Sequence, residues 1–202
     1  MSAQSIERTG QDGWSGEGRW PGPDRSRQRL ANYTIEDVLD LPDDAPRVEL
    51  RDGVMIVVPS PSFDHQDVVF LLQKWLRDRV PNGFRVSGAV GVAVGLNRTF
   101  EPDVLIVRPG VVGTRHYATA VEVLLTVEVV SPGTKQRDRL QKPADYAVAG
   151  IPFYWRIEQN PVHVYAYELV PDDKYRLVAD ADKELVLTRP FEIRLPIADI
   201  TP

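Results

Sequence analysis

The sequence contains no cysteine, no long uninterrupted apolar run, and no charged segment followed by an apolar leader. Without cysteine, disulfides and thiolate metal sites are excluded, so any metal must be held by oxygen ligands or histidine. The lack of long apolar runs argues against a membrane-spanning helix. We therefore expect a soluble, cytoplasmic protein with no membrane partner.

The chain also lacks a strong excess of charge of either sign. Its 24 basic and 29 acidic residues give a net charge of −5, and the pI is near 5.3. A mildly acidic protein has no overall attraction to a polyanion, so binding to nucleic acid would need a local basic patch. Taken alone, the charge balance counts against a DNA-binding role.

The chain has enough apolar residues for one substantial domain. Of its 202 residues, 43% are hydrophobic. Residues 1–30 are rich in Gly, Ser, Arg and Pro and show no apolar period, which predicts a disordered or loosely held N-terminal tail. We expect residues 31–202 to form a single domain.

Apolar periodicity and turn residues predict a mixed fold. Thr34 and Asp37 have the spacing of a helix cap, Asp52-Gly53 is typical of a two-residue hairpin turn, and residues 62–80 carry a helical apolar stripe. The segments expected to be strands are 84–95, 102–107, 121–130 and 151–158, followed by alternating strands up to residue 196. A helix is expected to run to about Ala149, with Gly150 as its C-terminal cap. The predicted class is α/β (α+β), a central mixed sheet flanked by helices with additional antiparallel C-terminal strands.

Two acidic residues lie where this pattern predicts buried strands. Glu128 is near the C-terminal end of the apolar run at 121–130, and a buried carboxylate needs a cation, a proton or several hydrogen bonds to compensate it. Asp103 follows Pro102 at the head of the run VLIV. Two acids on neighbouring strands would form an oxygen site suited to Mg²⁺, and a nearby lysine would supply the positive charge that phosphodiester cleavage needs.

Taken singly, each candidate residue has a simpler interpretation. Asp103 can be a turn residue that binds local backbone amides, and Glu128 can lie at a solvated sheet edge. Residues 135–139 can form an exposed helical face, and Glu49 beside the hairpin turn can be an ordinary cross-strand residue. His65, near a helix start, is more often a capping or surface residue than a ligand.

The order of these features nevertheless resembles that of one protein family. The most specific segments are EPDVLIV, VEVVSPGT, the spacing Asp138-x3-Lys142-x3-Tyr146 and AGIPFYWRIE, within about residues 33–170. They are similar to the Uma2 family, the former domain of unknown function 820, whose members are assigned to the PD-(D/E)xK restriction-endonuclease-like superfamily. The resemblance implies a restriction-endonuclease-like core and a Mg²⁺-dependent endonuclease, with Mn²⁺ as an alternative ion, that acts on nucleic acid, in the first place DNA.

The resemblance also implies roles for individual residues. Asp103 and Glu128 would be the metal-binding acids, and Glu49 an additional acid from the segment before the first core helix. The backbone carbonyl of Val129 would be a further ligand. His65 would be a supporting residue of this site.

The chain departs from the superfamily pattern two residues after Glu128. The superfamily has a lysine at that position, whereas this chain has Val130. The resemblance implies that the lysine has moved to the following helix, at Lys142, with Lys135 as the reserve candidate.

Helical spacing supports this displacement in part. Asp138, Lys142 and Tyr146 follow one another at intervals of four, so they would lie on one helical face, where Asp138 can pair with Lys142. Pro143 would kink the segment unless it lies in the first turn of a new helix.

Two hypotheses from different functional classes therefore stand. The first is the metal-dependent nuclease, favoured by Asp103, Glu128 and Lys142. The second is a catalytically weak or inactive nuclease-fold module that binds nucleic acid or a protein partner, favoured by the acidic balance and by Val130. Because a two-fold dimer cuts both strands of a duplex most simply, we also expect a homodimer, with the β-rich region after residue 160 as a source of the interface.

Overall fold

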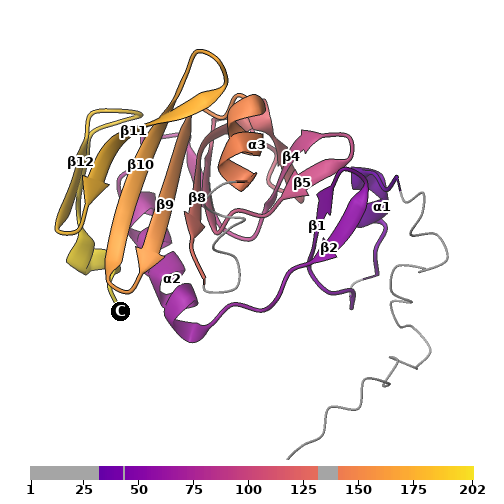
Figure 1. Ribbon diagram of the computed structural model, residues 1–202, viewed down its shortest axis with the longest axis horizontal. Coiled ribbons are helices and arrows are strands. Elements are labelled where there is room, and N and C mark those ends of the chain that lie inside the picture. Colours follow the sequence, from indigo (N-terminus) through magenta and orange to yellow (C-terminus); the bar gives the residue numbers. More distant parts are fainter. Residues whose placement is uncertain (1–31, 43, 132–140) are drawn as a thin grey trace, which may run out of the picture.

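The structure is a computed structural model that describes residues 32–42, 44–131 and 141–202 (Figure 1). The predicted tail at 1–30 and the candidate residues Lys135 and Asp138 lie outside the described residues. No helix in the described part of the chain is long and apolar enough to span a membrane.

The described residues form three α-helices and three β-sheets. The helices are α1 (Ile35–Leu39), α2 (Phe63–Arg77) and α3 (Lys142–Val148), with short 3₁₀ turns at η1 (Ala120–Glu122) and η3 (Ile197–Ile200). The large sheet has the order β11-β10-β9-β8-β6-β3, formed by β11 (Lys174–Ala181), β10 (Val162–Val170), β9 (Phe153–Gln159), β8 (Val123–Val129), β6 (Val104–Val107) and β3 (Arg85–Ser87). The second sheet has the order β2-β1-β5-β4-β7, formed by β2 (Val54–Val57), β1 (Val48–Arg51), β5 (Arg98–Phe100), β4 (Gly91–Gly95) and β7 (Tyr117–Thr119). The third is the hairpin of β12 (Glu184–Leu187) and β13 (Ile193–Pro196).

The six-stranded sheet is mixed, as predicted. Strands β8 and β9 pair in parallel, whereas the other neighbours in this sheet are antiparallel. Helix α3 lies in the connection between β8 and β9, which is the usual way to join two parallel strands. The predicted mixed α+β class with additional antiparallel C-terminal strands is confirmed.

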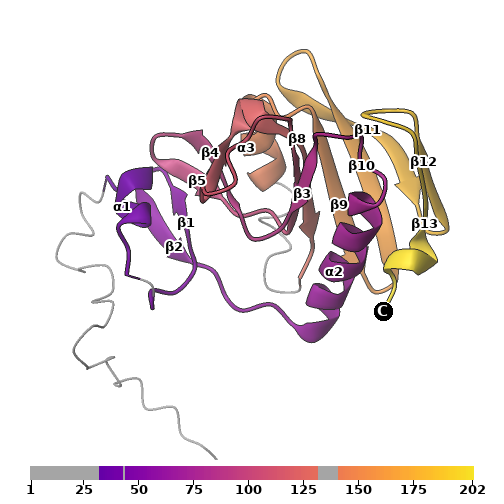
Figure 2. The ribbon, with the colours of Figure 1, turned by 180° about the vertical axis from the view of Figure 1, so that it is seen from behind.

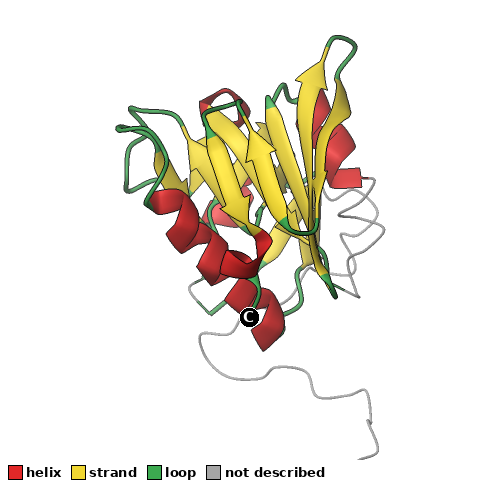
Figure 3. Ribbon diagram, turned by 90° about the vertical axis from the view of Figure 1, so that its left-hand side faces the viewer, coloured by secondary structure: helices red, strands yellow, loops and turns green. Residues whose placement is uncertain are grey.

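Alternating side chains bury the two faces of the six-stranded sheet against different layers. On β6, Val104 and Ile106 face a cluster with the apolar stripe of α2, whereas Leu105 and Val107 belong to a second cluster. The first cluster also contains the C-terminal hairpin and η3, on the side seen in Figure 2. The second contains residues of the five-stranded sheet and Tyr146 of α3. Helices α2 and α3 therefore cover opposite faces of the sheet (Figure 3).

The predicted hairpin and caps form for the expected reasons. Asp52 and Gly53 both have positive φ angles, 49° and 75°, as a two-residue turn matched to the twist of its strands requires. Thr34 and Asp37 make a reciprocal capping box at α1. Gly150, with φ of 79°, ends α3 in a Schellman motif, because Ile151 N donates to the Tyr146 carbonyl at 3.1 Å.

Two features differ from the expected arrangement. The hairpin β1–β2 does not join the central sheet but belongs to a separate five-stranded sheet, and β7 within that sheet was not predicted. Between the strands expected at 84–95 and 102–107, the structure adds a further strand, because Arg98–Phe100 form β5.

Candidate active site

Three ionisable side chains are buried together between the two larger sheets. Glu49 comes from β1 of the five-stranded sheet, Glu128 from the C-terminal part of β8, and Lys142 from the start of α3. These residues are only 2%, 2% and 3% exposed, respectively. Buried charges are costly unless they are paired and hydrogen-bonded, so the contacts among these three side chains offset the cost of burying them.

Lys142 joins the two glutamates. Its Nζ atom lies 3.0 Å from Oε1 and 2.9 Å from Oε2 of Glu128, and 3.0 Å from Oε1 of Glu49. All three distances lie within hydrogen-bonding range. A single ammonium therefore binds carboxylates that come from two different sheets.

Pro143 determines how this lysine reaches the site. It occupies the first turn of α3, where its missing N–H group is not required and its fixed φ angle suits the helix. The predicted kink is therefore avoided, and Lys142 and Tyr146 share the helix face that points to Glu128.

Tyr146 holds the other side of the Glu128 carboxylate. Its hydroxyl donates to Glu128 Oε1 at 2.7 Å, and the residue is fully buried. Burial raises the pKa of the Tyr146 hydroxyl well above its ordinary value, and the charge of Glu128 raises it further. The tyrosine is therefore a neutral hydrogen-bond donor throughout the physiological pH range.

Asp103 lies beside the same end of β8. Its Oδ2 atom accepts a hydrogen bond of 2.7 Å from Val129 N and lies 3.3 Å from His65 Nε2. The Asp103 side chain is 22% exposed, and its other oxygen, Oδ1, makes no hydrogen bond or ion pair with any residue that the structure describes. Asp103 is thus fixed by one oxygen while the other remains open to a ligand.

The acids at this end of β8 match the donor chemistry of Mg²⁺. This ion prefers oxygen ligands, binds through one or two carboxylates and keeps several waters. In residues 32–42, 44–131 and 141–202, however, no three side chains of Asp, Glu or His lie close enough together to hold a metal ion. The donor types therefore fit Mg²⁺, while in this arrangement the Lys142 ammonium compensates the two glutamates.

Several of the simpler interpretations are wrong in the structure. Glu128 does not lie at a sheet edge, because β8 is an interior strand. Glu49 is a cross-strand partner of Ile56, as the simpler interpretation has it, but it is also buried and paired with Lys142. Asp103 binds a distant backbone amide rather than its own turn. His65 is buried and contacts Asp103, and the helix cap is the neighbouring Ser62, whose Oγ accepts from His65 N at 3.3 Å.

Sequence reasoning missed Arg156, which lies directly beside Glu128. In the parallel register of β8 and β9, Glu128 pairs with Arg156, so both side chains emerge on the same face of adjacent strands. The segment AGIPFYWRIE does predict a strand, but the register of a parallel pair depends on tertiary packing and is not readable from one sequence. Val130, where the resemblance led us to expect a lysine, is buried directly after β8.

Comparisons with known proteins agree with this architecture. The model of the Uma2 family, described as "Putative restriction endonuclease", matches residues 35–198. A similar solved structure is described as a "putative nuclease belonging to DUF820 from Anabaena variabilis ATCC 29413". It shares 19% sequence identity with this chain at a TM-score of 0.65, and the alignment covers 83% of this chain and 96% of the other, which establishes a common fold. No curated protein matches the chain.

Proposed function

The chain belongs to the Uma2 family, and on that premise we propose that it is a metal-dependent endonuclease that hydrolyses phosphodiester bonds in nucleic acid, with DNA as the expected substrate. The observation that carries the proposal is the position of Lys142. Its Nζ atom lies 2.9 Å from Glu128, although Val130 occupies the strand position at which the superfamily has its lysine. Helix α3 thus supplies a cation at the acidic end of β8.

The acidic side chains would hold the ion. Asp103 and Glu128 are the proposed ligands, with Glu49 and the backbone carbonyl of Val129 as further donors. Mg²⁺ or Mn²⁺, when bound, would act as a Lewis acid toward the oxygens of the scissile phosphate. His65 and the Val129 amide fix the Oδ2 atom of Asp103 and so orient its carboxylate.

The remaining groups position charge around the phosphate. Lys142 supplies a positive charge to the phosphate as negative charge develops on it, and Tyr146 holds the Glu128 carboxylate in a fixed orientation by its 2.7 Å hydrogen bond. Phosphoryl transfer depends mainly on such positioning and electrostatic stabilisation. Lys142 contacts reacting atoms in this proposal, whereas Tyr146 and His65 are positioning residues.

A cleavage assay tests the proposal. Purified protein is incubated with supercoiled plasmid, linear duplex DNA, single-stranded DNA and RNA, each with Mg²⁺, Mn²⁺ or EDTA. We expect cleavage that needs the metal and is abolished by Asp103→Ala and by Glu128→Ala. Circular dichroism of both variants shows whether their fold is retained.

Glu184→Gln is the matched control for the acidic variants. Glu184 lies on β12, is exposed and contacts Arg194 only at 3.8 Å, so its substitution should leave cleavage unchanged. Full activity in a folded Asp103→Ala or Glu128→Ala variant would contradict the assignment of the site.

The binding module remains the second candidate function. The Lys142 ammonium already pairs with Glu49 and Glu128, so both glutamates have a cationic partner within the protein. Calorimetric titration with Mn²⁺ separates the two candidates, because the nuclease should show a site that disappears in Asp103→Ala. Absence of any such site would favour the binding module.

We also propose that the protein acts as a homodimer, because two catalytic centres are needed to cut both strands of a duplex at once. The free edges of the six-stranded sheet are β11 and β3. Analytical ultracentrifugation measures the assembly state, and a monomer at working concentration would contradict this part of the proposal.

A further inference from the structure

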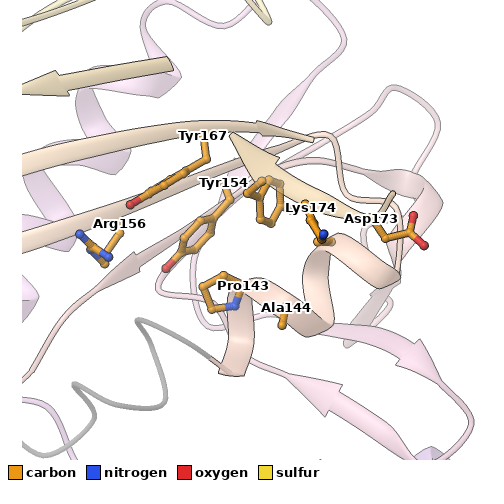
Figure 4. Close-up of a pocket in the computed structure, with 9 residues that line it drawn as sticks. Pro143, Ala144, Tyr154, Arg156, Tyr167, Asp173 and Lys174 are labelled. Carbon is orange, nitrogen blue, oxygen red and sulfur yellow. The ribbon is translucent and has the colours of Figure 1, made fainter. Parts of the chain in front are cut away.

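A pocket of about 350 Å³ lies next to the candidate active site, on the α3 side of the six-stranded sheet (Figure 4). We call it the tyrosine pocket. Its lining comes from α3, from β9 and β10, and from the start of β11 with the turn before it, and includes Pro143, Tyr154, Arg156, Tyr167, Lys174 and Tyr175. The volume is near the lower end of the range for small-molecule sites, about 300–1,000 Å³.

Three tyrosine rings form one wall of the tyrosine pocket. The Tyr154 ring stacks on Tyr167 with 5.6 Å between ring centroids, and it lies 5.5 Å from the Tyr175 ring. Tyr154 is buried, whereas Tyr167 and Tyr175 are only partly buried and so present ring surface to the cavity. Flat aromatic surface of this kind is what an unstacked nucleobase binds.

Cationic groups lie at both ends of the tyrosine pocket. Figure 4 shows Arg156 at one end and Lys174 next to Asp173 at the other, with Tyr154 and Pro143 between them. The Arg156 guanidinium lies 5.9 Å from the Tyr167 ring centroid. Asp173 is the acidic residue of the lining, and Glu158 Oε1 lies 3.3 Å from Arg156 Nε, so the charges around the pocket nearly balance.

Two residues of the tyrosine pocket are immediate neighbours of candidate active-site residues. Pro143, which lines it, directly follows Lys142, and Arg156 is the register partner of Glu128. Adjacent strands in a sheet lie about 4.8 Å apart, so Arg156 emerges one strand away from the acidic centre. A nucleotide whose base enters the pocket therefore has its phosphate on the side of Glu128 and Lys142.

We propose that the tyrosine pocket accepts one unstacked nucleobase, so that the substrate is single-stranded nucleic acid or a duplex with an unpaired nucleotide beside the cleaved bond. The faces of a base inside a duplex are covered by its stacked neighbours, whereas the faces of an unstacked base are free to stack on tyrosine. The inference rests on the proposed function for the position of the phosphate. Base binding itself can be measured without cleavage.

Fluorescence anisotropy in EDTA provides that measurement. The probes are a fluorescein-labelled 12-nucleotide single strand, its perfect duplex, and the same duplex with one bulged nucleotide. We expect the single strand and the bulged duplex to bind more tightly than the perfect duplex. Tyr167→Leu should weaken single-strand binding by about 5- to 150-fold, the range for loss of one stacked base, and leave binding of the perfect duplex unchanged.

Two further variants identify the cause of any loss. Tyr167→Phe keeps the ring and should bind the single strand as the natural protein does. Tyr165→Leu is the matched control, because Tyr165 lies on the same strand and its ring contacts Arg156 at 4.3 Å, but it does not line the pocket. Its affinity for the single strand should change less than twofold.

The outcomes separate this inference from the nuclease proposal. Equal binding of the single strand by Tyr167→Leu and the natural protein would overturn the inference, even if duplex cleavage is normal. An equal loss of single-strand affinity in Tyr165→Leu would also overturn it, because the effect would then act through Arg156 rather than through stacking. Absence of binding to every probe would overturn it as well. Binding that depends on Tyr167 in a protein that cleaves nothing would support the inference and refute the nuclease.

Discussion

Replacing Lys142 by methionine removes the buried cation while keeping an apolar side chain of similar length. In the structure its ammonium lies within 3.0 Å of two carboxylates that are themselves buried. At 3.0 Å and an effective dielectric constant of 20, each attraction amounts to about 5 kcal/mol, and desolvation of the three groups offsets much of it. Removing one partner of such a cluster costs about 3–5 kcal/mol.

Urea unfolding measures this loss. Trp75 and Trp155 are buried in the main core, so tryptophan fluorescence reports on global unfolding. We expect Lys142→Met to lower the unfolding midpoint without changing the dependence of the free energy on urea, the m-value. The matched control is Lys74→Met on the exposed side of α2, which should change the free energy of unfolding by less than about 0.5 kcal/mol.

A double variant isolates the electrostatic cause. Glu128→Gln in the Lys142→Met background removes one of the two carboxylate charges left without the ammonium, so it should recover part of the lost stability. Mg²⁺ should also stabilise Lys142→Met more than the natural protein, since the ion no longer competes with the ammonium. If Lys142→Met were as stable as Lys74→Met, the ion pairs of Lys142 would not contribute to the free energy of unfolding, which would contradict this reasoning.

Three further variants test other parts of the structure. Tyr146→Phe removes a hydrogen bond to a carboxylate and should lower the free energy of unfolding by about 1.5–3 kcal/mol, measured in urea; an unchanged value would contradict the contact. The Arg115 guanidinium lowers the pKa of Glu122 from 4.5 to about 2, so the stability that this carboxylate adds is full above pH 4.5 and is lost as the pH falls toward 2. Glu122→Gln should therefore lower the free energy of unfolding by up to about 1 kcal/mol at pH 7, a small value because solvent screens the ion pair. Below pH 2 the substitution should not change the free energy of unfolding. Thermal unfolding measured across this pH range tests both expectations. Gly150→Ala places a Cβ in open space at a φ of 79°, so only backbone strain of about 1–2 kcal/mol should appear in its melting curve; a larger loss would indicate a packing role.

Local patterns predicted most elements of the fold because their causes are local. The apolar stripe of α2, the Asp52-Gly53 turn and the Gly150 cap each depend on a few neighbouring residues, and all three are present. The assignment of β1 and β2 to a second sheet depends instead on which strands pack together over long distances in the sequence. No local pattern encodes that choice.

The site was predictable to the extent that family resemblance named its residues. Glu49, Glu128, Lys142 and Tyr146 meet in one buried cluster, which is consistent with the roles that the resemblance implies. Their catalytic roles stay predictions. Arg156 was missed because its place beside Glu128 arises from the parallel register, a tertiary property.

The origin of Glu49 and Glu128 in different sheets has a consequence for how the chain matures. The two residues are far apart in sequence, and closing such long loops is slow and entropically costly. An intermediate that has formed only the six-stranded sheet contains Glu128 without Glu49, and its acidic centre is incomplete. The buried ion cluster is therefore complete only when both larger sheets have formed and packed together.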